Sequence, residues 1–225
     1  MKSRLLSNGC SFNTPRPKDG VETFVSKEIA KHYNLEHTNL AMGGRGNKRI
    51  GFTTKWYFEL EKEAGQDSFV VIGWSSMVRN DYVSSDKHKV DRIDRTEIGW
   101  RTWKTTDEIK WLQGFKGYDI ENTLRMDFLD CVINLQSYLK LNKIPYVMYN
   151  ALPNYNDDTI LDFDVLSEAI DMTRFFAPST SHMEWIQQRG FVVSENDPHP
   201  SEEGHKIWAK QLIEFIDAND LRTYK

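Results

Sequence analysis

The chain has 225 residues, of which 39% are hydrophobic, and a formal net charge of −4. This length and composition suffice for one α/β domain with a buried core, and they exclude a chain that is disordered throughout. Acidic and basic residues alternate without a basic run, so a nucleic-acid partner has no electrostatic footprint in the sequence. The two cysteines, Cys10 and Cys131, are far apart and resemble neither a disulfide framework nor a metal knuckle.

The sequence also gives no sign of a membrane partner. No apolar run approaches the roughly 20 residues of a membrane span. The apolar run near the N-terminus is too short for the core of a signal peptide. We therefore expect a soluble, cytoplasmic protein, and we make no prediction of its oligomeric state.

The first expected element is a short strand that ends in small polar residues. The apolar run within residues 4–12 stops at Gly9 and is followed at once by Ser11. This pattern predicts the first central strand of an α/β sheet. Ser11 would then lie at the carboxyl end of that strand, where open parallel sheets bind their ligands. A serine in this place can also simply cap the next segment or bind turn backbone.

Helices and strands then alternate along the chain. Helical spacing of apolar residues predicts helices at 20–33 and 48–63, and apolar runs predict strands at 37–42 and 68–74. The run at 68–74 is apolar on both faces, as in a central parallel strand. The glycine-rich turn at 43–46 lets backbone N–H groups approach a ligand closely. It lacks the residue order of known phosphate loops, so a phosphate site is the weaker interpretation.

Residues 82–117 interrupt this alternation. The segment is charged and irregular, and it carries an unusual number of aromatic residues, namely Trp100, Trp103, Trp111 and Phe115. Long loops of this kind are typical of lids or binding surfaces. The tryptophans could equally form a small core beneath the loop.

The second half of the chain returns to the alternating pattern. We expect a long helix from about residue 118 to 139, a strand at 145–152, helices at 161–172 and 181–189, and a weak final strand at 191–193. An amphipathic helix follows to the end, with Ser201 as its expected N-cap. The sequence shows neither an internal repeat nor a flexible linker. One domain over residues 1–225, with an inserted excursion at 82–117, is the simplest organisation.

A histidine stands between two prolines directly before this last helix. Pro198 and Pro200 fix their own backbone and restrict the residues that precede them, so His199 is held stiffly. A neutral imidazole can accept a hydroxyl proton near pH 7, and a carboxylate beside it would orient the ring. Asp197 lies two residues before the histidine. A purely structural turn is the alternative interpretation.

Taken together, four segments follow the order and spacing of the SGNH or GDSL hydrolase family. Residues 9–12, Gly-Cys-Ser-Phe, look like the first block, with Ser11 in the place of the nucleophile and Cys10 in that of the usual aspartate. Residues 39–44 resemble the second block, residues 72–76 stand in the place of the third, and residues 197–201 resemble the last. The resemblance implies a catalytic triad of Ser11, His199 and Asp197. It also implies an oxyanion hole formed by the backbone N–H groups of Ser11 and Gly44.

The third block departs from the family pattern. Met77 stands where the family has an asparagine that donates to the oxyanion. Ser76, Arg79 and Asn80 are the polar neighbours that could replace it, and we assign the role to Ser76. Arg79 and Asn80 are then expected to contact substrate.

The last block also departs from the family. Its aspartate normally precedes the histidine by three residues, and Asn196 occupies that position here. Asp197 could reach the imidazole after a local adjustment, and Glu195 could serve instead.

The resemblance implies a three-layer α/β/α fold with a mostly parallel central sheet, of the flavodoxin-like type. The expected activity is hydrolysis of a small acyl ester through an acyl-enzyme on Ser11, with an O-acetylated carbohydrate as the candidate substrate. No cofactor and no metal are expected, since the other histidines show no ligand spacing. A non-catalytic binding module of the same fold is the alternative, followed by a nucleotide-binding or phosphate-binding α/β protein.

Overall fold

The computed structural model describes residues 3–84, 99–104, 120–154 and 168–223. Its centre is a five-stranded sheet in the order β2-β1-β3-β6-β7, in which every pair of neighbours is parallel. The strands are β1 (Arg4–Gly9), β2 (Glu36–Asn39), β3 (Ser68–Trp74), β6 (Tyr146–Asn150) and β7 (Phe175–Phe176). This confirms the predicted α/β fold with a mostly parallel sheet.

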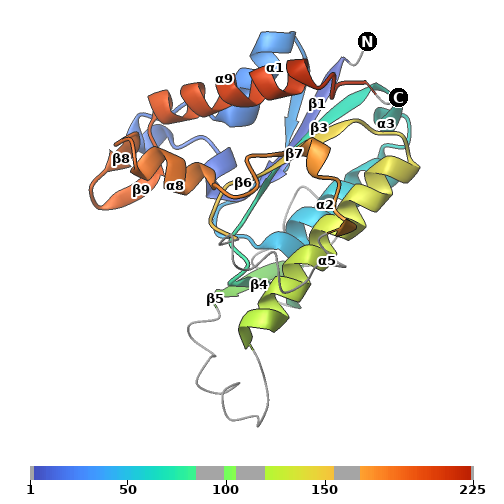
Figure 1. The fold of residues 1–225 in the computed structure, drawn as a ribbon, viewed down its shortest axis with the longest axis horizontal. Helices are drawn as coiled ribbons and strands as arrows, with labels where there is room; N and C mark the ends of the chain where they lie inside the picture. The colour runs from blue at the N-terminus through green and yellow to red at the C-terminus, as the bar shows by residue number, and fades with distance from the viewer. Residues whose placement is uncertain (1–2, 85–98, 105–119, 155–167, 224–225) are drawn as a thin grey trace.

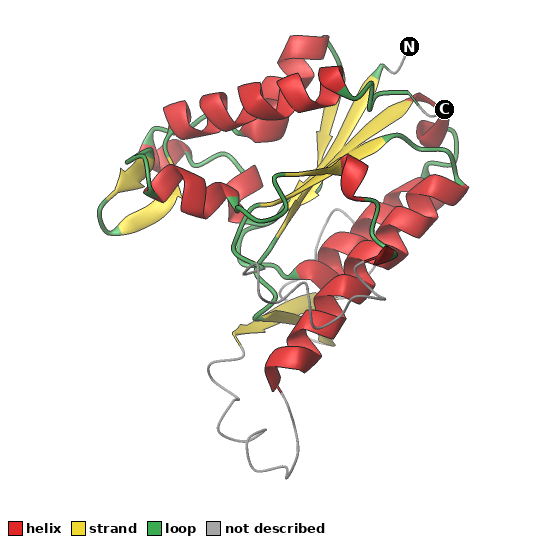
Figure 2. Ribbon diagram, in the orientation of Figure 1, coloured by secondary structure: helices red, strands yellow, loops and turns green. Residues whose placement is uncertain are grey.

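Helices cover both faces of the sheet (Figures 1 and 2). On one face lie α2 (Asn47–Leu60) and α5 (Ile120–Leu141). On the other lie α1 (Val25–Tyr33) and α9 (Glu202–Ala218). Successive side chains of a strand point to opposite faces, so Leu6 contributes to the core under α2 and α5 whereas Leu5 contributes to the core under α1 and α9. β3 is buried along its whole length, which explains why its sequence is apolar on both faces.

The helix ends follow from local sequence. Ser201 accepts a hydrogen bond from Gly204 N at 3.2 Å and caps α9, as predicted. Ser181 and Glu184 form a capping box at the start of α8 (His182–Gln187). The other helical elements within the described residues are short: α3 (Ala64–Asp67) and the 3₁₀ helices η1 (Ser11–Asn13), η2 (Pro17–Asp19) and η6 (Met172–Arg174).

The prediction that residues 82–117 are irregular is wrong for part of this segment. β4 (Arg79–Ser84) and β5 (Gly99–Lys104) pair as two antiparallel strands. The side chain of Trp100 is 6% exposed and its ring lies 5.4 Å from that of Phe52 on α2, so this tryptophan belongs to a small core. Trp111 and Phe115 lie outside the described residues.

The end of the sheet also differs from the prediction. β8 (Val192–Ser194), the expected final strand, pairs antiparallel with β9 (Asp197–Pro200) in a separate hairpin. The fifth strand of the central sheet is β7, whose two residues are too few to show a period in the sequence. The helix predicted at 161–172 lies mostly outside the described residues. Among the helices that are described, none is long and apolar enough to cross a membrane.

Candidate active site

Ser11 lies just beyond the carboxyl end of β1, where η1 begins. Two glycines let η1 close over the sheet: a Cβ on Gly9 of β1 or on Gly73 of β3 would overlap the side-chain amide of Asn13. The side-chain Oδ1 of Asn13 accepts a hydrogen bond from the Tyr149 hydroxyl at 2.6 Å. Small residues in the strands and a polar anchor on β6 therefore fix the segment that carries Ser11.

The structure brings Ser11 and His199 together although 188 positions separate them in the chain. The Ser11 Oγ lies 2.9 Å from His199 Nε2, within hydrogen-bond distance. On the other side of the ring, His199 Nδ1 lies 2.6 Å from Asp197 Oδ1. The imidazole packs against the buried ring of Phe12, with ring centroids 5.1 Å apart. A hydroxyl, an imidazole and a carboxylate thus stand in line, the arrangement that raises the nucleophilicity of a serine.

The two-residue spacing of Asp197 and His199 has a simple structural cause. Both residues lie in β9, where side chains at positions i and i+2 point to the same face. His199 therefore lies in a strand, and not in the turn that was the alternative interpretation of this segment. Glu195, the alternative partner, is exposed in the turn between β8 and β9, so the structure places Asp197 at the ring.

A further residue joins this cluster that the sequence did not point to. Arg16 donates from Nη1 to Asp197 Oδ1 at 3.1 Å and from Nη2 to Asp197 Oδ2 at 2.7 Å. These hydrogen bonds hold the pKa of Asp197 well below its ordinary value, with smaller contributions from His199. A weak signal was available, since Arg16 stands between Pro15 and Pro17 just as His199 stands between two prolines.

The glycine turn predicted to hold the oxyanion lies beside Ser11. A Cβ on Gly43 would stand 3.7 Å from the Ser11 Cβ, so the two backbones are close. Gly44 has φ +75°, in the left-handed region that glycine adopts without strain. A Cβ on Gly46 would overlap the Arg79 carbonyl, which leaves no room for another residue there. The oxyanion role of Gly44 stays a prediction.

A buried carboxylate anchors this turn to β4. Asp81, which is 6% exposed, accepts hydrogen bonds from Gly46 N and Arg49 N at 2.9 Å each and from Thr102 Oγ1 at 2.6 Å. It thereby caps α2. Two backbone donors that a phosphate would need at this helix end are already taken, which speaks against the phosphate interpretation.

The third block is built around Ser75. Its backbone N–H donates to Asn47 Oδ1 at 2.8 Å, and its carbonyl accepts from Asn47 Nδ2 at 2.9 Å. Ser76 is half-buried, and its hydroxyl accepts from Val78 N at 3.4 Å. The oxyanion role of Ser76 stays a prediction.

The two residues expected to bind substrate have protein partners. Arg79 Nη1 donates to Ser75 Oγ at 3.3 Å, and Asn80 is exposed and accepts from Lys48 Nζ at 3.2 Å. Arg79 also acts on Cys10, the residue before Ser11. Burial raises the pKa of the Cys10 thiol, and the nearby guanidinium opposes that shift. Substrate contact by Arg79 and Asn80 stays a prediction.

Three other histidines, His37, His182 and His205, can be compared with His199. Ser7 Oγ lies 2.8 Å from His37 Nε2, but Ser7 is fully buried within β1, so a substrate cannot reach its hydroxyl. His182 and His205 are buried, and the His182 ring lies against Phe12 and is stacked on Trp208, with ring centroids 4.9 Å apart in the stacked pair. Burial lowers the pKa of His205 to about 3 and that of His182 well below its ordinary value. Among the described residues, no group of three His, Cys, Asp or Glu is placed to hold a metal ion.

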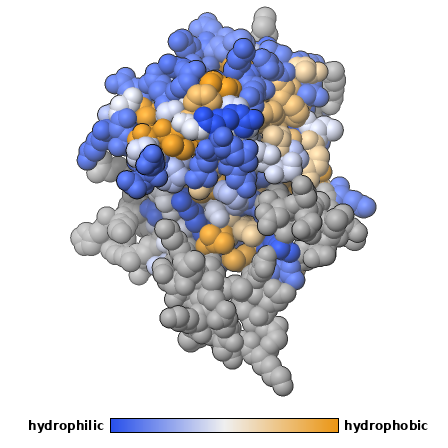
Figure 3. All heavy atoms as spheres, turned by 60° about the vertical axis from the view of Figure 1, so that its left-hand side comes forward, coloured by the Kyte–Doolittle hydropathy of each residue, from blue (hydrophilic) through white to orange (hydrophobic). Residues whose placement is uncertain are grey.

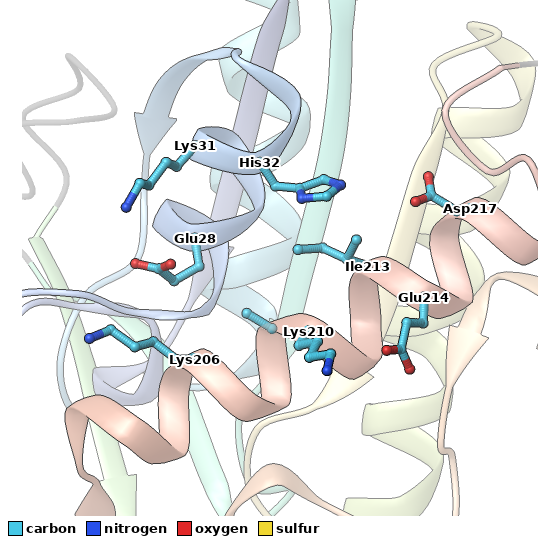
Figure 4. A pocket seen from close by; sticks show the side chains of 9 residues that line it. Glu28, Lys31, His32, Lys206, Lys210, Ile213, Glu214 and Asp217 are labelled. Atoms are coloured by element: carbon cyan, nitrogen blue, oxygen red, sulfur yellow. The ribbon is translucent and has the colours of Figure 1, made fainter.

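A separate hollow lies elsewhere on the described part of the molecule. A groove of about 610 Å³ runs between α1 and α9 and is lined by charged side chains of both signs (Figure 4). None of its lining residues belongs to the Ser11 cluster. The side of the molecule that carries the β8–β9 hairpin shows a mainly hydrophilic described surface with small hydrophobic patches (Figure 3).

Comparison with known proteins identifies this fold. No family model matches the sequence, and no curated protein matches it. The structure is similar to that of TesA, with a TM-score of 0.51 and 11% identity over 96% of this chain and 99% of the other. A Slackia heliotrinireducens protein assigned to the SGNH hydrolases gives a TM-score of 0.50 and 14% identity over 96% and 100% of the two chains.

An acetyl xylan esterase (Est2A) from the rumen bacterium Butyrivibrio proteoclasticus is similar at a TM-score of 0.47 and 10% identity, and this chain covers 64% of its length. At 11% and 14% identity, the similarity to TesA and to the Slackia heliotrinireducens protein shows the fold alone. The chain therefore has the fold of the SGNH hydrolases.

Proposed function

We propose that this protein is a serine hydrolase of the SGNH type that cleaves a small acyl ester through an acyl-enzyme on Ser11. The observation that carries the proposal is the continuous chain of hydrogen bonds from Ser11 Oγ through His199 to Asp197, at 2.9 and 2.6 Å. Its members come from the two ends of the sequence, and the position of Ser11 just after β1, at the carboxyl edge of the sheet, supports the proposal.

The chemistry follows from this geometry. His199 Nε2 accepts the Ser11 proton as Oγ attacks the ester carbonyl, and Asp197 stabilises the imidazolium that forms. Backbone N–H groups of Ser11 and Gly44 meet the oxyanion, with Ser76 as the third donor. His199 then passes the proton to the leaving alcohol. Water, deprotonated by the same imidazole, releases the acid and restores the serine.

The substrate proposal is a small acyl ester whose alcohol is a carbohydrate. It rests on the number of aromatic residues in the sequence at 82–117. One of them, Trp100, is buried in a small core. Fold and triad do not select the leaving group. A panel of p-nitrophenyl acetate, butyrate and octanoate, followed by O-acetylated oligosaccharides, tests chain length and leaving group separately. Faster release of octanoate than of acetate would contradict the small acyl group.

The test of the activity itself is ester hydrolysis by matched variants. Ser11→Ala and His199→Ala should each lower kcat/KM for p-nitrophenyl acetate by at least about 10³-fold. The controls Ser137→Ala and His32→Ala remove exposed residues of α5 and α1 and should keep the wild-type rate. Equal rates in all five proteins would remove the proposal.

One observation favours a second candidate, a binding module that has lost catalysis. Met77 replaces the oxyanion-donating asparagine of the third block, and the loss of one such donor typically costs about 3 kcal/mol of transition-state stabilisation. A binding module would hold the ester without turnover. Saturable binding of an acetylated sugar by wild type, with hydrolysis no faster than in Ser11→Ala, would favour it over the hydrolase.

A further inference from the structure

The carboxylate of the proposed triad, Asp197, accepts hydrogen bonds both from its own strand and from Arg16, which lies far away in the sequence. Asp197 Oδ1 accepts hydrogen bonds from His199 N at 3.1 Å, from His199 Nδ1 at 2.6 Å and from Arg16 Nη1 at 3.1 Å. Asp197 Oδ2 accepts from Arg16 Nη2 at 2.7 Å. Oδ1 thus accepts three hydrogen bonds and Oδ2 accepts one, and two of these four bonds come from Arg16. The carboxylate cannot rotate without breaking a bond to Arg16.

Arg16 is itself placed rigidly. It lies between Pro15 and Pro17, which restrict its backbone. Its N–H donates to the Val21 carbonyl at 2.7 Å, and its own carbonyl accepts from Val21 N at 3.1 Å. The planar guanidinium matches the two oxygens of a carboxylate, which a lysine ammonium cannot do.

The second partner of Arg16 steadies its side chain. Asp19 Oδ2 lies 2.9 Å from Arg16 Nη2. The side chains of Arg16 and Asp197 are 22% and 26% exposed, so water competes for both and an unheld carboxylate would turn toward solvent. The orientation of the Asp197 carboxylate therefore depends on its contact with Arg16 more than on burial.

We propose that Arg16 is the positioning residue of this site, whose bidentate contact holds Asp197 Oδ1 against His199 Nδ1. This inference rests on the proposed function, and it goes beyond the three residues that define the triad. With Oδ1 fixed, the neutral ring carries its proton on Nδ1 and leaves Nε2 free to accept the proton of Ser11. Without Arg16, the ring is free to adopt the opposite tautomer, which cannot act as the base.

The direct test is the tautomer of His199, measured by ¹⁵N NMR of histidine-labelled protein above the pH at which the ring is protonated. The six histidines are distinguished with His199→Ala, which removes one signal. In wild type we expect a protonated Nδ1 and an unprotonated Nε2. In Arg16→Met we expect the nitrogen signals to shift toward the Nε2-protonated form. In Arg16→Lys, which retains the charge but not the fork, the shift should be intermediate.

Kinetics give an independent readout. Arg16→Met should lower kcat by about 10²-fold with KM nearly unchanged, because the loss is one of alignment. Asp19→Asn weakens the contact that steadies the Arg16 side chain, so it should change the tautomer and kcat in the same direction as Arg16→Met, but by less. Arg4→Met, at the opposite end of β1, is the matched control for loss of an arginine.

The outcomes separate this inference from the function. A folded Arg16→Met protein with the wild-type tautomer and kcat overturns the positioning role, whatever the substrate. If wild type hydrolyses no ester but Arg16→Met shifts the tautomer, the proposed function fails and the positioning role stands. Should Arg16→Met not fold, Arg16→Lys decides, since an unchanged tautomer and kcat in that folded variant would also contradict the proposal.

Discussion

Lowering the pH from 7 to 5 should destabilise the fold through its buried histidines. His182 and His205 are 0% and 1% exposed, and the centroids of their rings lie 5.5 Å apart. Burial lowers the pKa of His205 to about 3 and that of His182 well below its ordinary value. Both rings therefore stay neutral in the folded protein across this range, while the same residues become protonated in the unfolded chain.

The sign and size follow from proton linkage. An unfolded histidine has a pKa of about 6.5, so between pH 6.5 and the folded values the unfolded chain binds more protons and stability falls with falling pH. The stability is complete above about pH 6.5. At pH 5 each neutral buried histidine costs about 2 kcal/mol, and the two together about 4 kcal/mol. Burial also lowers the pKa of His37 to about 4, which adds a similar loss at that pH. Such a sum approaches the whole stability of a typical domain, about 5–15 kcal/mol.

Urea unfolding at pH 7, 6 and 5 measures this loss. His205→Gln removes one titrating ring and should reduce the difference between pH 7 and pH 5 by about 2 kcal/mol. His32→Gln, on the exposed face of α1, should leave the difference unchanged. A wild-type loss below about 1 kcal/mol, or a His205→Gln variant with the full wild-type loss, would refute the reasoning. Ester hydrolysis should accordingly be compared among variants above pH 6.5, where the fold is intact.

Two further predictions concern the anchors of the site. Asp81→Ala leaves the N–H groups of Gly46 and Arg49 and the Thr102 hydroxyl without their acceptor, so urea unfolding should show that the free energy of unfolding falls by about 3 kcal/mol. The control Asp130→Ala, at an exposed residue, should change the free energy of unfolding by less than about 0.5 kcal/mol. Equal effects of the two substitutions would contradict the role of Asp81 as an anchor. Gly73→Ala places a Cβ in overlap with the Asn13 amide and 2.9 Å from the Tyr149 hydroxyl, so it should cost about 1–3 kcal/mol and displace η1 with Ser11. The control is Gly51→Ala in α2, where the methyl group has room, and this substitution should stabilise the protein by about 0.5–1 kcal/mol. A Gly73→Ala protein that unfolds and hydrolyses esters like wild type would show that the close packing at Gly73 is unimportant.

The central layers of the fold were predictable because their sequence pattern is dictated by burial. β3 was predicted with its observed bounds, since a strand covered on both faces must be apolar throughout. The long helix α5 followed from apolar residues at three-residue and four-residue steps. β7 was missed because its two residues owe their place to pairing with Met148 and Tyr149 of β6, and no local pattern records that pairing.

Only those residues of the site that stand in distinctive local sequences could be predicted. Ser11 and His199 stand in distinctive local sequences, and the fold brings them together. The choice between Asp197 and Glu195 stayed open because it depends on whether the segment is a turn or a strand, which β8 pairing decides. Arg16 was missed because its partner lies 181 positions away, and its place between two prolines does not identify that partner.

The most direct measurement of the central claim is the site at which a fluorophosphonate attaches to the folded protein, mapped by peptide mass spectrometry. The hydrogen-bonded chain of Ser11, His199 and Asp197 predicts one adduct on Ser11. It also predicts no adduct in Ser11→Ala and at least about 10³-fold slower labelling in His199→Ala. An unreactive Ser11 in folded wild type, or an adduct on a different serine, would contradict it.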